Sequence, residues 1–185
     1  MPLSRNEAAD ALRDIAQTER RSSSAYGYKE TAPFMFLWGV IWFVGYSASD
    51  LRPEQSSWLW PVLVVLGFVG SFVIGSRHPS KAKGGTSEGW RHFASWIVVA
   101  LFIFATILLF QPQDGRKVGA FVALLIGAAY AVIGIWMGTR LAIAGVAVIV
   151  LTIAGFVFLK SHFGLWMAFV GGGTLILTGA WLRRV

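Results

Sequence analysis

Two apolar stretches near the end of the chain, GAAYAVIGIWMGT at residues 127–139 and GGTLILTGAWLRR at residues 172–184, decide the predicted fold. Aligned without gaps, they match Gly127 with Gly172, Gly134 with Gly179 and Trp136 with Trp181. Both belong to uncharged segments of about 20 residues, the length that a helix needs to cross the hydrocarbon core of a bilayer. The two stretches therefore predict two related membrane-spanning helices.

The composition of the whole chain also indicates a membrane protein. Of its 185 residues, 56% are hydrophobic and only 14% are charged, whereas a typical soluble domain has about 25% charged residues. The chain contains no cysteine. This excludes disulfides, thiolate metal sites and cysteine nucleophiles.

Uncharged segments of spanning length occur six times: at residues 33–49, 57–76, 93–110, 118–139, 141–159 and 163–182. We therefore expect an all-α polytopic membrane protein in two parts. A cytoplasmic helix and joint make up residues 1–32, and a bundle of six transmembrane helices makes up residues 33–185. Pro33 is expected in the first turn of the first span, where its missing N–H would remove no helical hydrogen bond.

The distribution of lysine and arginine predicts the orientation of the bundle. One side of the membrane receives Arg5, Arg13, Arg20, Arg21, Lys29, Arg77, Lys81, Lys83, Arg91, Arg140, Arg183 and Arg184. The other side receives Arg52, Arg116, Lys117 and Lys160. Because basic residues are enriched in cytoplasmic loops, both termini are expected in the cytoplasm.

The formal net charge of +7 raises the question of nucleic-acid binding. The basic residues, however, lie where the apolar segments end, and they form no stripe with interleaved aromatic residues. These are the positions that the positive-inside rule describes. We therefore expect contact with membrane lipid and no nucleic-acid partner.

The similarity of the fourth and sixth spans extends to the spans before them. VALFIFATILLF at residues 99–110 aligns with VIVLTIAGFVFL at residues 148–159 if the loop after the third span is allowed a few more residues. The repeating unit is then a helical hairpin. A unit with an even number of spans keeps its orientation when it is duplicated, so the copies are expected to be parallel repeats. The first hairpin, residues 33–76, is a candidate for a third and more divergent copy.

Helices in lipid associate largely through van der Waals packing, and small residues let their backbones approach closely. The glycines of the repeat are therefore expected to be helix-packing contacts. They are Gly127, Gly134, Gly138, Gly172 and Gly179, and Gly134 and Gly138 form a GxxxG pair.

The hairpin repeat, with its G-x6-G spacing near the end of each second helix, resembles the HdeD-like family of small bacterial inner-membrane proteins. The resemblance covers residues 93–184, and it implies six spans in the bacterial cytoplasmic membrane. Members of that family are linked to acid resistance. The N-terminal helix and the aromatic first span, PFMFLWGVIWFVGY at residues 33–46, depart from the family pattern. We therefore carry over neither acid resistance nor any functional residue.

The N-terminal segment is polar, unlike the rest of the chain. Ser4 and Glu7 have the spacing of a capping box, in which each side chain satisfies a free backbone N–H at the start of a helix. We expect a short cytoplasmic helix over residues 5–22, followed by a Ser-rich joint.

Ala8, Leu12 and Ile15 recur at helical spacing and give this segment one narrow apolar stripe. Two partners for the stripe remain open. One is the cytoplasmic face of the same bundle, and the other is a second protein or another copy of the chain. Leu12 and Ile15 are therefore candidate partner-binding residues.

Residues suited to catalysis are missing from the predicted spans. All nine acidic residues lie in the N-terminal segment or in loops, whereas proton relays and ion sites need ionisable side chains within the membrane. The sequence contains no paired carboxylates, no HExxH motif, no nucleophile elbow and no phosphate-cradling loop. We therefore expect no enzyme activity, no metal site and no cofactor.

Few polar side chains lie at depth in the predicted spans. Tyr130, Thr106 and Thr152 are candidates for a polar pocket. The Tyr130 hydroxyl needs a partner away from water, so it is expected to form an interhelical hydrogen bond. The alternative is a polar point in a small-molecule or lipid pocket.

Two classes of function remain. The first is a non-enzymatic membrane protein that acts as a scaffold, accessory subunit or stress-related component through helix packing and its N-terminal helix. The second is a small channel or carrier for neutral or apolar molecules, built as a homo-oligomer because six short helices enclose little volume.

Overall fold

The computed structural model of the protein describes the backbone of residues 5–77 and 86–184. Within those ranges, side chains are described for Asp14 and from Gly27 onward, except for residues 86–90 and 92. The helices are α1 (Arg5–Leu51), α2 (Pro53–Arg77), α3 (Thr86–Phe110), α4 (Gly115–Met137), α5 (Thr139–Phe158) and a last crossing made of α6 (Phe163–Trp166), the π-helix η1 (Met167–Gly172) and α7 (Gly173–Arg183).

Within the part of the chain that the structure describes, six helical segments are long and apolar enough to cross a membrane. They are Gly27–Leu51, Pro53–Arg77, Phe93–Phe110, Gly115–Met137, Thr139–Phe158 and Phe163–Arg183. Each overlaps one of the predicted spans. The predicted all-α fold, with six helices long and apolar enough to span a membrane, is therefore confirmed over the described residues.

The longest helix, α1, has 47 residues, which corresponds to about 70 Å at 1.5 Å per residue. It runs through the predicted joint, so the prediction of a separate short helix followed by a joint is wrong: residues 22–24 are helical. A serine costs a helix only about 0.5 kcal/mol relative to alanine, so a few serines do not end one.

Pro33 also lies inside α1 rather than in its first turn. A proline in a helix interior removes the hydrogen bond to the carbonyl four residues earlier, here that of Lys29. Lys29 is exposed, and the helix continues past the proline to Leu51.

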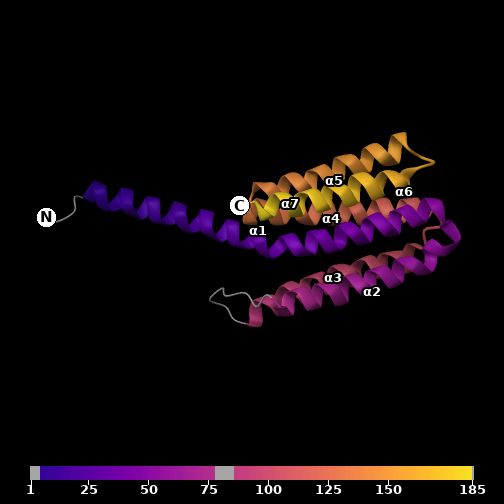
Figure 1. Cartoon of the computed structure of the whole chain (residues 1–185), viewed down its shortest axis with the longest axis horizontal. Coiled ribbons are helices and arrows are strands. Elements are labelled where there is room, and N and C mark those ends of the chain that lie inside the picture. Colours follow the sequence, from indigo (N-terminus) through magenta and orange to yellow (C-terminus); the bar gives the residue numbers. More distant parts are fainter. Residues whose placement is uncertain (1–4, 78–85, 185) are drawn as a thin grey trace.

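The bundle is organised around α1 (Figure 1). One side of α1 packs on α2 and another side packs on the last crossing, while α4 and α5 form a closely packed antiparallel pair. The most peripheral helix is α3, whose spanning segment contains no buried residue.

The N-terminal part of α1 extends past the ends of the other helices (Figure 1). We call residues 5–26 the arm. The end of the bundle next to the arm is the arm end, and the opposite end, where α1 turns into α2, is the far end.

The last crossing contains a π-helical turn, η1, that ends within a run of three glycines. Glycine is a poor helix former, so successive glycines weaken α-helical hydrogen bonding at this point. The Thr174 hydroxyl donates a hydrogen bond to the carbonyl oxygen of Val170 at 2.6 Å. The side chain of Thr174 therefore helps to satisfy the backbone where the helix is wider.

Tyr46 of α1 is the centre of an aromatic cluster near the far end. Its ring meets those of Trp42, Trp60 and Phe163 edge to face, at centroid distances of 5.6, 5.0 and 6.4 Å. Its hydroxyl donates a hydrogen bond to the carbonyl oxygen of Gly119 in α4 at 2.8 Å. Tyr46 therefore joins four helices and satisfies its own hydroxyl away from water.

Asp50, in the last turn of α1, caps the start of the last crossing. Its carboxylate oxygens accept hydrogen bonds from the backbone N–H groups of Gly164 at 3.1 Å and Leu165 at 2.8 Å. The first N–H groups of a helix have no carbonyl partner within that helix. Asp50 supplies this partner from a different helix.

Asp50→Ala is expected to lower the free energy of unfolding by about 1 kcal/mol, the usual worth of a helix cap. Thermal unfolding of the detergent-solubilised protein, followed by tryptophan fluorescence, measures the loss. Gln55→Ala, at an exposed position of the adjacent helix α2, is the control and should leave stability unchanged. Equal stability of the two variants would show that the carboxylate is not a working cap.

Candidate functional sites

The predicted packing glycines of α4 lie at its crossing with α5. A methyl group on Gly127 would lie 3.0 Å from the carbonyl oxygen of Gly145 and 2.9 Å from Cγ1 of Ile149. A methyl group on Gly134 would overlap the backbone nitrogen of Ala142. Because that obstacle is backbone, it cannot turn aside, and only glycine fits at Gly134 while the helices keep this separation.

The predicted packing glycines of the last crossing lie against α1. A methyl group on Gly172 would lie 2.9 Å from the carbonyl oxygen of Gly39, and one on Gly179 would lie 3.1 Å from the carbonyl oxygen of Ala32. Gly127 and Gly172, which correspond in the sequence alignment, therefore each oppose a glycine of an antiparallel helix.

Gly138 has a different role from the one predicted. It lies in the link between α4 and α5 with a φ of 137°, a conformation that favours glycine. The GxxxG pair with Gly134 on one helix face is therefore not formed, because α4 ends at Met137. A methyl group on Gly138 would overlap the hydroxyl of Tyr28, so the link is also closely packed.

The two threonines proposed for a polar pocket are satisfied within their own helices. Thr106 Oγ1 donates a hydrogen bond to the carbonyl oxygen of Phe102 in α3 at 2.8 Å. Thr152 Oγ1 donates to the carbonyl oxygen of Val148 in α5 at 2.7 Å. In both threonines the hydroxyl proton is already donated to a backbone carbonyl, so it is not available to a ligand.

Tyr130, the third pocket candidate, packs its ring against Trp96 of α3 at a centroid distance of 6.0 Å. The structure shows no hydrogen bond from its hydroxyl to any other described residue. The interhelical tyrosine hydrogen bond expected from the sequence is instead made by Tyr46.

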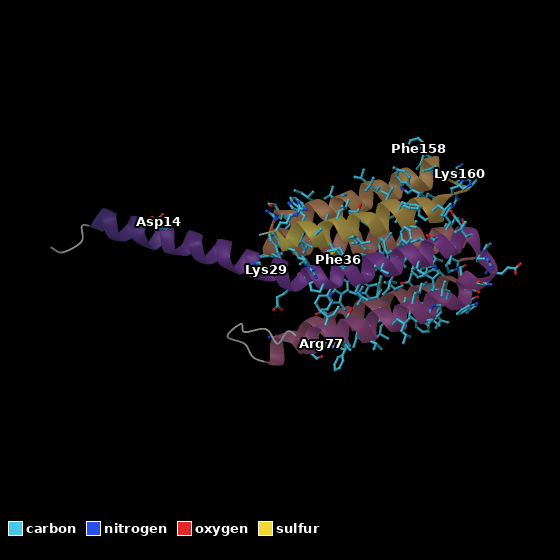
Figure 2. All side chains as sticks on the ribbon, in the orientation of Figure 1. Asp14, Lys29, Phe36, Arg77, Phe158 and Lys160 are labelled. Atoms are coloured by element: carbon cyan, nitrogen blue, oxygen red, sulfur yellow. The ribbon has the colours of Figure 1, made fainter. Side chains whose placement is uncertain are left out.

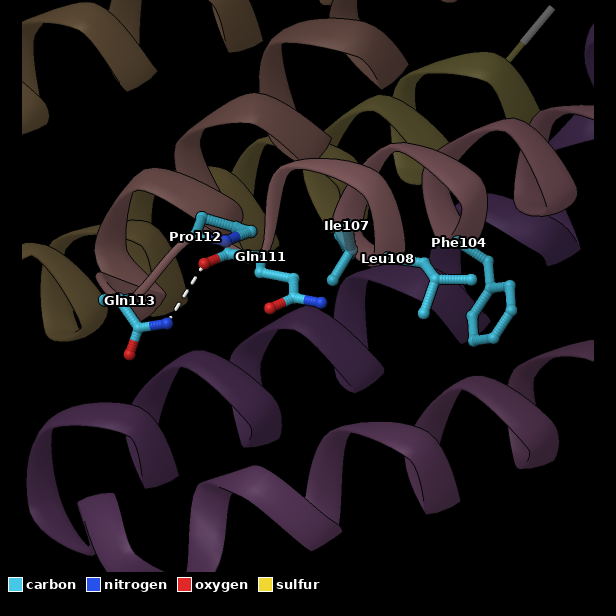
Figure 3. A pocket seen from close by; sticks show the side chains of 6 residues that line it. All are labelled: Phe104, Ile107, Leu108, Gln111, Pro112 and Gln113. Carbon is cyan, nitrogen blue, oxygen red and sulfur yellow. Dashed lines mark hydrogen bonds between the residues drawn. The ribbon is translucent and has the colours of Figure 1, made fainter.

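An open cavity of about 350 Å³ lies at the far end of α3 (Figure 3). It is lined by Phe104, Ile107, Leu108, Gln111, Pro112 and Gln113. All of these belong to the end of α3 and the turn after it, so the surface comes from one short piece of chain. None of the three pocket candidates lines this cavity.

Leu12 and Ile15 belong to the arm, and their side chains lie outside the described residues. The backbone places both positions on the part of α1 that extends away from the bundle (Figure 1). This direction disfavours the first of the two partners considered for the apolar stripe, the face of the same bundle.

Among the described residues, no three His, Asp or Glu side chains come together in a way that could hold a metal ion. The chain matches no family model, and no curated protein or solved structure is significantly similar to it. The features of this chain that bear on function are therefore the arm and the charged residues at the two ends of the bundle.

Arg140, the second residue of α5, joins three helices at the arm end. Its guanidinium donates a hydrogen bond to the carbonyl oxygen of Trp181 at 2.9 Å. Its Cζ lies 5.0 Å from the ring centroid of Trp181 and 5.8 Å from that of Tyr28. Two residues after Trp181, Arg183 places its Cζ 4.7 Å from the ring centroid of Phe36. Aromatic rings therefore hold both guanidinium groups through cation–π contacts.

Arg116 makes related contacts at the far end, with one difference. Its guanidinium donates to the carbonyl oxygen of Lys160 at 3.2 Å, and its Cζ lies 4.7 Å from the ring centroid of Phe156. In addition, its Nη2 lies 3.8 Å from a carboxylate oxygen of Asp114. Arg116 thus has an anionic partner in the protein, whereas no described residue provides one for Arg140.

Charge is distributed unequally between the two ends. The described charged residues at the arm end of the bundle are Lys29, Glu30, Arg77, Arg91, Arg140, Arg183 and Arg184. Those at the far end are Asp50, Arg52, Glu54, Asp114, Arg116, Lys117 and Lys160. Figure 2 shows Lys29 and Arg77 toward the arm end and Lys160 at the opposite end. The arm end is therefore the more positive of the two.

The sequence did not single out four residues that make these contacts: Gly39, Gly145, Tyr28 and Arg140. Gly145 carried a signal, because it lies among small residues in AIAGVAV at residues 142–148. In the sequence, Arg140 is distinguished only as one of the basic residues that predict the orientation. Its contacts with Trp181 and Tyr28 join segments that are far apart in the chain, so no local sequence pattern predicts them.

Proposed function

We propose that the protein is a non-enzymatic membrane scaffold that presents its arm to a partner protein on the cytoplasmic side of a bacterial inner membrane. The observation that carries this proposal is the continuity of α1: the helix that forms the arm is also the central helix of the bundle. A continuous helix fixes the direction of the arm relative to the membrane, which a flexible tether would not do.

The charge difference between the two ends supports the proposed orientation. Basic residues exceed acidic ones more strongly at the arm end, and this pattern is typical of the cytoplasmic side. The resemblance of residues 93–184 to HdeD-like proteins supports placement in a bacterial inner membrane. In this orientation the arm lies in the cytoplasm.

The sequence of the arm supports a protein partner rather than the membrane surface. Residues 5–26 contain four basic and four acidic side chains, whereas helices that lie on anionic membranes are markedly basic. The stripe of Ala8, Leu12 and Ile15 is narrow, as on a helix that packs against one other surface. A neutral helix with such a stripe suits a protein groove or a second copy of the chain.

Photo-crosslinking in native membranes tests this proposal. We expect a photoreactive residue at Leu12 or Ile15 to give a crosslinked product of defined added mass, because both positions lie on the apolar stripe. The same residue at Asp14, which is exposed and nearly opposite Leu12 on the helix, should give little product. A product of twice the chain mass would identify another copy of the chain as the partner.

Crosslinks from Leu12 and Ile15 to peptides of the chain's own bundle would contradict the proposal. So would equal crosslinking from both faces of the arm. Peptide mass spectrometry distinguishes these outcomes, because it identifies the segment attached at each position.

Deletion of residues 2–24 is expected to leave the thermal unfolding of the bundle unchanged and to abolish co-purification of the crosslinked partner. The reason is that the arm extends away from the packed helices (Figure 1). Thermal unfolding and affinity purification of the same sample measure the two effects. Loss of folding would assign the arm a role within the bundle instead.

We also infer that α3 with α4, and α5 with the last crossing, are parallel copies of one hairpin. The equivalent positions Gly127 and Gly172 support this, since each packs against a glycine of an antiparallel helix at nearly the same distance. The partners differ, however: α4 packs on α5, and the last crossing packs on α1.

A further inference from the structure

Four of the described cations at the arm end of the bundle form no ion pair with another described residue. We call Lys29, Arg140, Arg183 and Arg184 the basic cluster. They come from α1, from the start of α5 and from the end of the last crossing, which the contacts of Arg140 bring together. None of them forms an ion pair in the part of the chain that the structure describes.

Arg140 is the fixed member of this cluster. The half-buried side chain lies near the rings of Tyr28 and Trp181. One of its N–H groups donates a hydrogen bond to the carbonyl oxygen of Trp181. A guanidinium has five N–H donors, so most of its donors remain available in a set orientation. A planar fork of this kind matches the oxygens of a phosphate better than any neutral acceptor does.

The position of Arg140 along the membrane normal suggests the source of that phosphate. Arg140 is the second residue of the spanning segment Thr139–Phe158, so it lies where the helix meets the headgroup layer. Trp181 beside it is 41% exposed, and exposed tryptophans concentrate at the same level. The phosphodiester of a phospholipid lies at this depth, within reach of a residue at the helix end.

The geometry points to a binding site for the phosphate of an anionic phospholipid headgroup. Arg140 is the bidentate donor, and Lys29, Arg183 and Arg184 supply the surrounding positive charge. An anionic headgroup is favoured over a zwitterionic one, because the four cations of the basic cluster outnumber Glu30, the one acidic side chain described at the arm end, and so repel a headgroup ammonium. This site is independent of the proposed scaffold function, since none of its residues belongs to the arm.

Native mass spectrometry of the whole protein tests the site, with phosphatidylglycerol and phosphatidylcholine offered at equal concentration. We expect the wild-type protein to retain phosphatidylglycerol preferentially. Arg140→Lys should lower that preference about tenfold, because lysine keeps the charge but loses the bidentate geometry and the stacking on aromatic rings. Arg184→Gln should lower it by a smaller factor without touching the packing of the bundle.

Arg116→Lys is the matched control, because Arg116 has the same cation–π and carbonyl contacts but is paired with Asp114. This variant should retain phosphatidylglycerol as the wild type does. Equal loss in Arg116→Lys and Arg140→Lys, or no preference for phosphatidylglycerol in the wild type, would overturn the proposal. If the wild type retains inorganic phosphate in place of phosphatidylglycerol when the two are offered at equal concentration, the ligand is free phosphate, and the lipid assignment is overturned.

Discussion

Gly134→Leu is expected to lower the free energy of unfolding by about 3 kcal/mol or more, because overpacking a tight contact forces the backbones apart. Even the methyl group of Gly134→Ala would overlap the backbone nitrogen of Ala142 in α5. Backbone cannot rotate away as a side chain can, so the antiparallel pair α4–α5 must separate. Thermal unfolding in detergent, followed by circular dichroism, measures the loss for both variants.

Gly173→Ala is the control for this experiment. Gly173 begins α7 in a helical conformation, and a methyl group there would meet nothing within 4 Å. Alanine in place of an unobstructed helical glycine stabilises a helix by up to about 1 kcal/mol. If Gly134→Ala were as stable as Gly173→Ala, α4 and α5 would not cross as closely as described.

Gly39→Leu is expected to lower the free energy of unfolding by about 2 to 3 kcal/mol. Gly39 lies where α1 packs against the last crossing. Here the nearest obstacle is a side chain. A methyl group on Gly39 would lie 2.7 Å from Cγ1 of Ile176 and 3.0 Å from the carbonyl oxygen of Gly172. Part of the loss should therefore be reversible by shortening Ile176.

A double-mutant cycle with Gly39→Ala and Ile176→Ala measures the free energy of the contact between these two positions. We expect a favourable coupling of about 1 kcal/mol, because the second substitution removes the atom that the first one meets. Ile176→Ala combined with Gly134→Ala should be additive, since the two positions lie at different crossings. Additivity in both cycles would contradict the described contact between Gly39 and Ile176.

The spans could be predicted from the sequence because a bilayer imposes a simple requirement on them. A spanning helix needs length and freedom from charge, and both are properties of a continuous segment. The third span illustrates this: it was predicted at residues 93–110, and these residues lie within helix α3, which ends at Phe110. This prediction needed no knowledge of the helices that pack beside it in the bundle.

The continuity of α1 could not be predicted in the same way. Serine and proline near residues 22–33 read locally as a joint and a new start, yet serine weakens a helix only slightly. Whether a helix continues through such a segment is decided by the sum of small terms over many residues. The residues on either side of the expected joint gave no strong signal in either direction.

The packing sites were predictable only where the sequence repeats itself. Gly127 and Gly172 were found because they match each other, and the structure places both at helix crossings. Their partners Gly145 and Gly39 do not occupy matching positions of the predicted repeat. Which helix a glycine packs on depends on the arrangement of all six spans, and a single hairpin does not contain that information.

The charged sites were likewise predictable only where they depend on a continuous segment of the sequence. The excess of basic residues on one side was visible in the sequence, because it depends only on which loops are connected by which spans. The contact of Arg140 with Trp181, 41 positions later in the chain, required the helices to be assembled. The same is true of Asp50, which caps a helix more than 100 residues away.

The distance across the expected joint tests the central claim, that α1 is one rigid helix from the arm into the membrane. The chain has no cysteine, so Asp14→Cys and Val40→Cys, both at exposed positions, can carry spin labels without background. Double electron–electron resonance in nanodiscs should give one narrow distribution centred at about 39 Å, the length of a continuous helix between these positions. A broad distribution that extends to much shorter distances would show a flexible joint and contradict the account.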